Sequence, residues 1–124
     1  MRPAWPASAA LLALAAACPA AADEGAGRAA YERYCADCHH MELHGTGHGP
    51  ELTGPGFLSR WENHSTTELL DYISMLMPAG TPGSLSRADY RNVLAYMLLR
   101  NGAPPGGVGF DPESPVRIGA VLQG

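Results

Sequence analysis

Lysine does not occur in this sequence: all eight basic residues are arginine, and the twelve acidic residues outnumber them. The formal net charge at pH 7 is −4. Proteins that bind nucleic acid neutralise its phosphates with clusters of Lys and Arg, so this composition argues against a nucleic-acid partner. It favours partners that are met through hydrophobic or positively charged surfaces.

Long hydrophobic runs are also missing. The apolar run Ala9–Ala17 is well short of the roughly 20 residues that a membrane-spanning helix needs, and no later segment approaches that length. It follows Arg2 and precedes Ala20–Ala22, a pattern typical of a secretory signal peptide that is cut after Ala22. We therefore predict a signal peptide over residues 1–22 and an exported, periplasmic protein without a membrane span.

Cysteine is scarce, with three residues in the whole chain. Leu14–Cys18 resembles a lipoprotein-processing box, so a lipid anchor on Cys18 stays open as an alternative. Once a signal peptide is removed, only Cys35 and Cys38 remain, and a scaffold of several disulfides is excluded. The remaining residues, roughly a hundred, are enough for one small domain, which would be marginal on apolar packing alone and needs a further stabilising element. We place this domain at residues 23–103, followed by a Gly/Pro-rich tail at 104–124.

The two remaining cysteines lie in Cys35-Ala36-Asp37-Cys38-His39. This is the C-x-x-C-H haem-attachment pattern, in which two thioethers fix the porphyrin and the imidazole binds its iron. On a helical turn, positions i and i+3 project from one face, so both thiols can reach one edge of the macrocycle. The sequence therefore predicts one covalent haem c, held by Cys35, Cys38 and His39.

Two other uses of a C-x-x-C pair fit less well. A structural zinc site needs four ligands, and no further cysteine follows Cys38, so histidines would have to be recruited. A thioredoxin-like redox motif needs a strand followed by a crossover helix, and residues 31–40 do not read that way.

Three stretches have helical character. Gly25–His40 reads as the first helix, in which Gly27 and Tyr31 indicate a close helix crossing or an ordinary amphipathic stripe. Ser65 and Glu68 form a capping-box pattern that predicts a helix over Thr66–Leu76. A last helix opens after Ser86, again with an acid three residues on, and stops at Asn101-Gly102. The last helix is the expected partner of the Gly27 face.

The segment from His40 to Phe57 is rich in glycine and proline, which argues against a stable helix. The imidazole of a metal-binding histidine usually donates its other N–H to a carbonyl, and we expect that acceptor around Gly49-Pro50. Leu43 and Leu52 either face the porphyrin or fill a generic loop core.

Further side chains have two interpretations each. Arg60 and Trp61 could serve the haem propionates, although plain solvent exposure and plain packing explain them equally. His40, His44 and His48 are interpreted as solvated loop residues, with a weak surface metal site as the other possibility.

Met77 is the candidate sixth ligand of the iron. A thioether often completes the coordination in electron-transfer haem proteins and raises the reduction potential. Met77 leaves a predicted helix directly before a proline, so its backbone would be rigid. Met75 competes but lies off the apolar stripe, and a methionine is often packing filler.

Six motifs, taken together, carry a family resemblance. They are Tyr34–His39, Leu43-x-Gly45, Gly49-Pro50-x-Leu52-x-Gly54, Arg60-Trp61, Met77-Pro78 and Pro82–Ser86. In this order they resemble the class I cytochromes c, and look most similar to the cytochromes fused to or accompanying bacterial quinoprotein (PQQ-dependent) dehydrogenases. The resemblance covers about Gly25–Gly102.

This resemblance implies a small all-α fold of three to five helices around one haem, with the first and last helices crossing. It also implies that His39 and Met77 are the axial ligands and that the Pro50 carbonyl is the partner of His39. One departure is His40, which stands where such proteins commonly have glycine and puts a second imidazole near the haem edge. The segment 103–124 lies outside the motif set.

The predicted function is that of an electron-transfer protein rather than an enzyme. It would accept single electrons from a dehydrogenase, such as a quinoprotein, and pass them to an oxidase or another cytochrome of the respiratory chain. The alternative is a haem-based enzyme or a gas-binding or sensing module with a displaceable sixth ligand. A third possibility is a bound subunit of a larger dehydrogenase.

Overall fold

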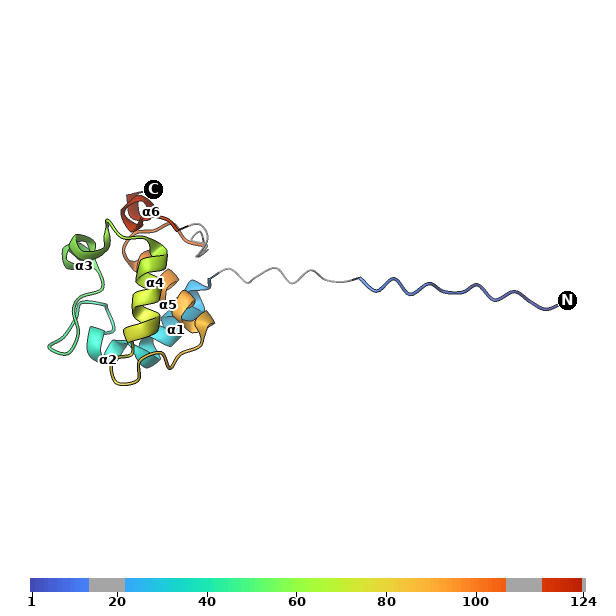
Figure 1. Cartoon of the computed structure of the whole chain (residues 1–124), viewed down its shortest axis with the longest axis horizontal. Helices are drawn as coiled ribbons and strands as arrows, with labels where there is room; N and C mark the ends of the chain where they lie inside the picture. Colours follow the sequence, from blue (N-terminus) through green and yellow to red (C-terminus); the bar gives the residue numbers. More distant parts are fainter. Residues whose placement is uncertain (14–21, 107–114, 124) are drawn as a thin grey trace.

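The computed structural model describes residues 1–13, 22–106 and 115–123, and within these ranges it contains six helices and no strand (Figure 1). The helices are α1 Glu24–Tyr34, α2 Ala36–His39, α3 Gly54–Trp61, α4 Thr66–Leu76, α5 Arg87–Arg100 and α6 Ile118–Gln123. The all-α class is confirmed. The described residues form one helix more than the three to five expected. The first predicted helix is divided into α1 and α2, and the tail adds the short helix α6.

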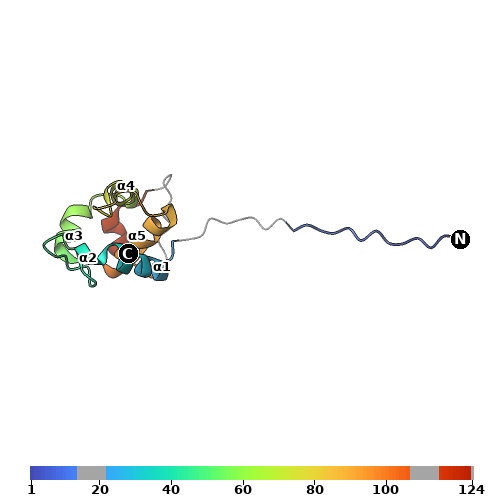
Figure 2. The same cartoon turned by 90° about the horizontal axis from the view of Figure 1, so that it is seen from below.

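Helix α5 lies between α1 and α4 (Figure 2). A Cβ added at Gly27 would overlap with the backbone carbonyl of Asn92, so only glycine allows the two helices to approach so closely. One turn later the rings of Tyr31 and Tyr96 are in contact, with centroids 5.5 Å apart. The predicted crossing of the first and last helices is confirmed.

The helix starts follow their capping signals. Ser65 Oγ accepts a hydrogen bond from the Glu68 N–H, and the Glu68 carboxylate accepts one from the Ser65 N–H. Helix α4 therefore begins and ends where the capping box and Pro78 predict. Ser86 caps α5 in the same way, because its Oγ accepts from the Asp89 N–H at 3.0 Å.

Two boundaries differ from the sequence prediction. The helix predicted over Gly25–His40 is interrupted at Cys35, whose φ and ψ of −120° and −32° are not helical, and α2 restarts for a single turn. The segment predicted to lack a helix up to Phe57 instead starts α3 at Gly54. Pro55 explains this start, since proline suits the first turn of a helix, where its missing N–H has no intrahelical partner.

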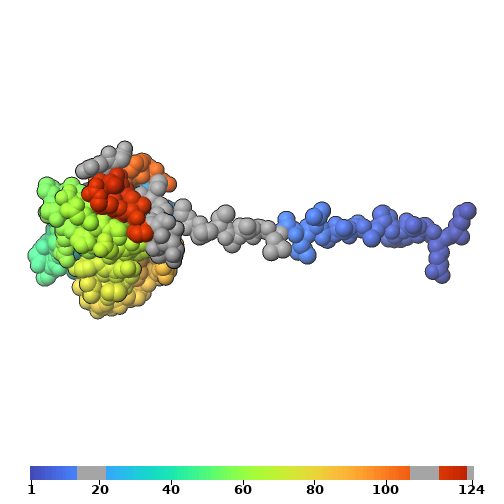
Figure 3. Space-filling model, turned by 45° about the horizontal axis from the view of Figure 1, so that its top comes forward, coloured from blue at the N-terminus to red at the C-terminus, as the bar shows by residue number. Residues whose placement is uncertain are grey.

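The described part of the tail folds back onto the domain beside α3 and α4 (Figure 3). The Thr66 N–H donates to the Val116 carbonyl at 2.8 Å, and the Ile118 N–H donates to the His64 carbonyl at 2.9 Å. The Ile118 side chain is completely buried. Residues 115–123 therefore support the connection between α3 and α4.

Three sequence predictions fall partly or wholly outside the described residues, among them the Gly/Pro-rich tail, of which residues 107–114 and 124 are not described. Cys18, the alternative lipid-anchor position, lies in the range 14–21 that the structure does not describe, and so does part of the predicted signal peptide. No helix in the described ranges is both long enough and apolar enough to span a membrane.

Candidate haem site

A cavity of about 420 Å³ opens between the helices, and its wall is mainly apolar. Its size is in the range of small-molecule and cofactor sites. All eight residues that the sequence singled out for cofactor binding lie on this wall: Cys35, Cys38, His39, Pro50, Leu52, Arg60, Trp61 and Met77. Their roles toward a haem stay a prediction, but the fold brings them to one place.

His39 is nearly buried and is held through its ring. Its Nδ1 lies 2.8 Å from the Pro50 carbonyl oxygen, and because a carbonyl can only accept, Nδ1 carries the proton. The other ring nitrogen, Nε2, is then left with a lone pair for a metal. This is the tautomer that a histidine ligand needs.

The chain around His39 is tied down as well. A Cβ at Gly49 would lie 2.8 Å from the Cys38 carbonyl oxygen and 3.0 Å from the His39 ring, so glycine is required for this approach. The Thr46 hydroxyl donates to the same Cys38 carbonyl at 2.6 Å, and the Gly45 N–H donates to the His39 carbonyl at 2.9 Å. The loop thus fixes the attachment turn from outside.

Both motif cysteines are free thiols at the cavity wall. Burial, followed by the neighbouring Cys38, raises the pKa of the Cys35 thiol to about 11. Cys38 is exposed. Two thiols one helical turn apart, one inside and one at the edge of an apolar cavity, fit the attachment of a flat apolar macrocycle.

Met77 lies at the wall directly after α4. Among the described methionines only Met77 and Met97 line the cavity, whereas the Met75 side chain is 68% exposed. Met75 therefore does not lie where it could act as an iron ligand in this cavity. Met97 lies in α5, where its side chain is buried.

Arg60 and Trp61 contact a third residue that the sequence patterns did not single out. The Arg60 guanidinium donates to the Tyr72 hydroxyl at 3.1 Å and lies over the rings of Trp61 and Tyr72. All three residues line the cavity. A cation and a phenol at the wall are suitable partners for carboxylates such as haem propionates.

The leucines of the glycine-rich loop have different roles. Leu52 lies on the cavity wall, but Leu43 does not, and its side chain is completely buried in the core. Of the two interpretations given for Leu43, the structure favours the loop core. The backbone of Leu43 is held as well, because the Thr53 hydroxyl donates to its carbonyl oxygen at 3.4 Å.

Asn101 is a further residue whose importance the sequence patterns did not show, since only its helix-stop signal was recognised. Its amide donates to the Leu52 carbonyl at 2.9 Å and accepts from the Gly54 N–H at 3.2 Å. Asn101 thereby joins the end of α5 to the loop that carries Leu52.

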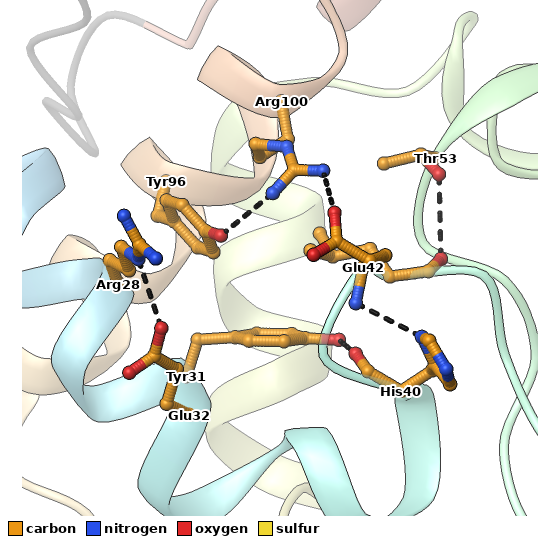
Figure 4. Close-up of polar contacts among 9 residues, drawn as sticks. Arg28, Tyr31, Glu32, His40, Glu42, Thr53, Tyr96 and Arg100 are labelled. Carbon is orange, nitrogen blue, oxygen red and sulfur yellow. Dashed lines mark hydrogen bonds and ion pairs between the residues drawn. The ribbon is translucent and has the colours of Figure 1, made fainter.

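His40 does not lie on the cavity wall, whereas His48 does. The His40 Nδ1 accepts from the Glu42 N–H, and the His40 carbonyl accepts from the Tyr31 hydroxyl at 2.7 Å (Figure 4). Burial raises the pKa of the Tyr31 phenol, which stays a donor. Glu42 pairs with Arg100 at 3.0 Å. His40 thus belongs to a network that closes the loop onto α1 and α5.

A surface metal site gains no support. The rings of His40 and His44 stack with centroids 5.7 Å apart. In the part of the chain that the structure describes, no three His, Cys, Asp or Glu side chains come together in a way that could hold a metal ion.

This chain matches a known protein family and is similar to a solved structure. Residues 22–97 match the family described as "Cytochrome C oxidase, cbb3-type, subunit III". The solved structure "Crystal Structure of the Sulfane Dehydrogenase SoxCD from Paracoccus pantotrophus" is similar with a TM-score of 0.56 and 26% sequence identity. The match covers 82% of this chain and 51% of the other, so this chain spans about half the length of its neighbour. No curated protein matches it.

Proposed function

We propose, because this chain belongs to the cytochrome c family described as cbb3-type cytochrome c oxidase subunit III, that it is a periplasmic single-haem carrier of one electron at a time. Members of this family bind haem c covalently and transfer electrons. We extend this proposal to its compartment, its redox partners and the residues that hold the haem.

The observation that carries the proposal is that the whole expected ligand set lies on the wall of one cavity. In our proposal Cys35 and Cys38 form the thioether bonds, and His39 and Met77 bind the iron. Haem bound in this way supplies one-electron redox chemistry through its iron. His39 Nδ1 donates to Pro50 and so keeps Nε2 available, while Arg60 and Trp61 lie where propionates could be bound.

With His39 and Met77 both bound to the iron, a substrate would find no free position on it. Apolar residues such as Phe57, Ile73 and Val93 line the cavity and limit the entry of water. A packed, apolar surrounding keeps the rearrangement that accompanies electron transfer small. These features favour transfer of electrons over catalysis.

We propose the redox partners of this chain from its net charge and from its similarity to the solved structure. The neighbour is titled a sulfane dehydrogenase, which supports a dehydrogenase as the donor, and a quinoprotein dehydrogenase is the donor that the sequence motifs favour. The acceptor is an oxidase or another cytochrome. The net charge of −4 favours a basic docking surface on the partner, with association that weakens as salt rises.

Export is tested on the mature protein itself. Cleavage after Ala22 would leave Asp23 as the first residue, whereas lipid processing would leave a modified Cys18. Mass spectrometry of protein purified from the periplasmic fraction distinguishes the two, and an uncleaved chain in the cytoplasm would contradict both.

The electron-carrier function is tested by carbon monoxide. A ferrous haem whose sixth ligand is held in place resists carbon monoxide at neutral pH, and we expect this result. Rapid stoichiometric binding would contradict the carrier function and support a gas-binding or enzymatic haem protein.

A further inference from the structure

The backbone of Met77 is contacted by a tyrosine of the following helix, α5. Tyr90 is 5% exposed, and its hydroxyl donates to the Met77 carbonyl at 2.7 Å. The same hydroxyl accepts from the Leu85 N–H at 3.3 Å. One side chain therefore joins the two ends of the loop at residues 77–85.

Tyr90 is itself on a rigid element. It lies in the first turn of α5, where its N–H donates to the Ser86 carbonyl at 3.1 Å, and α5 packs between α1 and α4. A group that is meant to position another must have its own place fixed by packing, and the start of α5 fulfils this condition.

Met77 is held on both sides of its Cα atom. Its N–H donates to the Ile73 carbonyl at 3.0 Å, as the last bond of α4, and its carbonyl accepts from Tyr90. Between these two bonds the residue is extended, with φ −118° and ψ 153°. With both flanking peptide groups fixed, the direction in which the side chain leaves the backbone is fixed too.

This restraint matters because methionine is an unbranched, flexible side chain and its sulfur is uncharged. The occupancy of such a ligand depends on how well the protein holds it beside the metal, since ordering a mobile group costs free energy. Groups behind a ligand that fix its orientation commonly tune metal binding.

We propose that Tyr90 is a positioning residue for Met77, whose phenol holds the Met77 carbonyl so that the thioether stays on the iron. The proposal rests on the proposed function, in which Met77 is the sixth ligand. The Gly83 N–H also donates to the Met77 carbonyl, at the longer distance of 3.3 Å, so loss of the phenol loosens the loop without removing every contact.

The test compares Tyr90→Phe with Tyr96→Phe in the ferric holoprotein. Exogenous imidazole competes with Met77 for the iron, and we expect Tyr90→Phe to bind it about five- to tenfold more tightly, the equivalent of one hydrogen bond. The rate at saturating imidazole, which reports release of the native ligand, should rise as well. Tyr96 is on the same helix, but its hydroxyl contacts Arg100 and not the loop, so Tyr96→Phe should match the wild type.

Met77→Ala separates this proposal from the proposed function. If Met77→Ala binds imidazole far more tightly than the wild type while Tyr90→Phe does not, the role of Tyr90 is overturned and the ligand assignment stands. That role is equally overturned if Tyr90→Phe lowers the unfolding temperature but leaves imidazole binding and its rate unchanged. If Met77→Ala and wild type bind imidazole equally, the ligand assignment itself fails.

Discussion

The two sides of the cavity are built differently. On the His39 side, a single turn of helix and the loop that directly follows it surround the proposed ligand, and the contacts come from that same loop, as far as Pro50. On the Met77 side, the chain leaves α4 and is fixed by Tyr90, thirteen residues later. The first side is specified locally, and the second depends on how α4 and α5 pack.

This difference suggests different consequences of damage. The His39 side combines the proposed thioether bonds with several hydrogen bonds, so changes there should reduce stability before they free the ligand. The Met77 side has one strong backbone anchor on its carbonyl, so changes there should alter ligation and potential while the fold persists.

The largest expected effect is that of Met77→Ala. Removing the thioether should lower the reduction potential by on the order of 0.1 V or more, within the roughly 0.8 V range that axial ligands span. Redox titration measures this shift. Met75→Ala is the matched control, because the Met75 side chain is 68% exposed and should leave the potential unchanged. Equal reduction potentials for Met77→Ala and Met75→Ala would contradict the proposed difference between the two sides of the cavity.

Gly49→Ala tests the His39 side. The added methyl would approach the Cys38 carbonyl and the His39 ring, and the Thr46 hydroxyl prevents that carbonyl from moving freely. We expect the free energy of unfolding to fall by about 3 kcal/mol, the upper end for overpacking. Denaturant unfolding measures it. Gly47→Ala is the control, since nothing lies within 4 Å of a Cβ at that position. If both variants were equally stable, the close approach of the loop to the His39 ring would not restrict the residue at position 49.

Asn101→Ala tests whether a distant residue also supports the His39 side. The substitution leaves the Leu52 carbonyl and the Gly54 N–H without their partner, and we expect a loss of about 2 kcal/mol in unfolding free energy. The exposed Asn63→Ala should have little effect on the same measurement. A loss as small as that of Asn63→Ala would mean that the loop keeps its place without α5.

The smallest effect is expected for Glu42→Gln. The hydrogen bond and charge of Arg100 lower the pKa of the Glu42 carboxyl below its ordinary value of 4.5. A carboxyl with a lowered pKa stabilises the fold above that ordinary value, and the stabilisation is lost as the pH falls through the lowered pKa. The difference in stability between wild type and Glu42→Gln should therefore be present at pH 7 and vanish in acid.

Urea unfolding at a series of pH values measures this difference, which added salt should also reduce. Glu32→Gln is the control, because the ion pair of Glu32 with Arg28 lies within one helix and joins no separate elements. A difference that persists below the pKa would show that the contact is not electrostatic.

The parts of the fold that could be predicted are those whose causes are local. The capping box at Ser65 and the proline after Met77 define α4, and Gly27 with Tyr31 predicts the helix crossing. The C-x-x-C-H motif could be recognised for the same reason, because its spacing alone places both cysteines on one face of a helical turn. The break at Cys35 could not be predicted in the same way, because the surrounding residues are good helix formers.

The residues that were missed make contacts between separate helices and loops. Tyr72, Tyr90 and Asn101 read as parts of helical stripes or stop signals, and that description is correct as far as it goes. Their contacts with Arg60, Met77 and Leu52 depend on how helices and loops meet in three dimensions. Pattern and spacing do not contain that information.

The central claim is that a methionine sulfur on one side and an imidazole on the other hold the iron of a covalently attached haem. The most direct measurement is the long-wavelength absorption of the ferric protein, where a sulfur-to-iron charge-transfer band reports the thioether bond. We predict that the band is present in the wild type and in Met75→Ala and is lost in Met77→Ala. A wild-type protein without the band, or a band that survives in Met77→Ala, would contradict the claim.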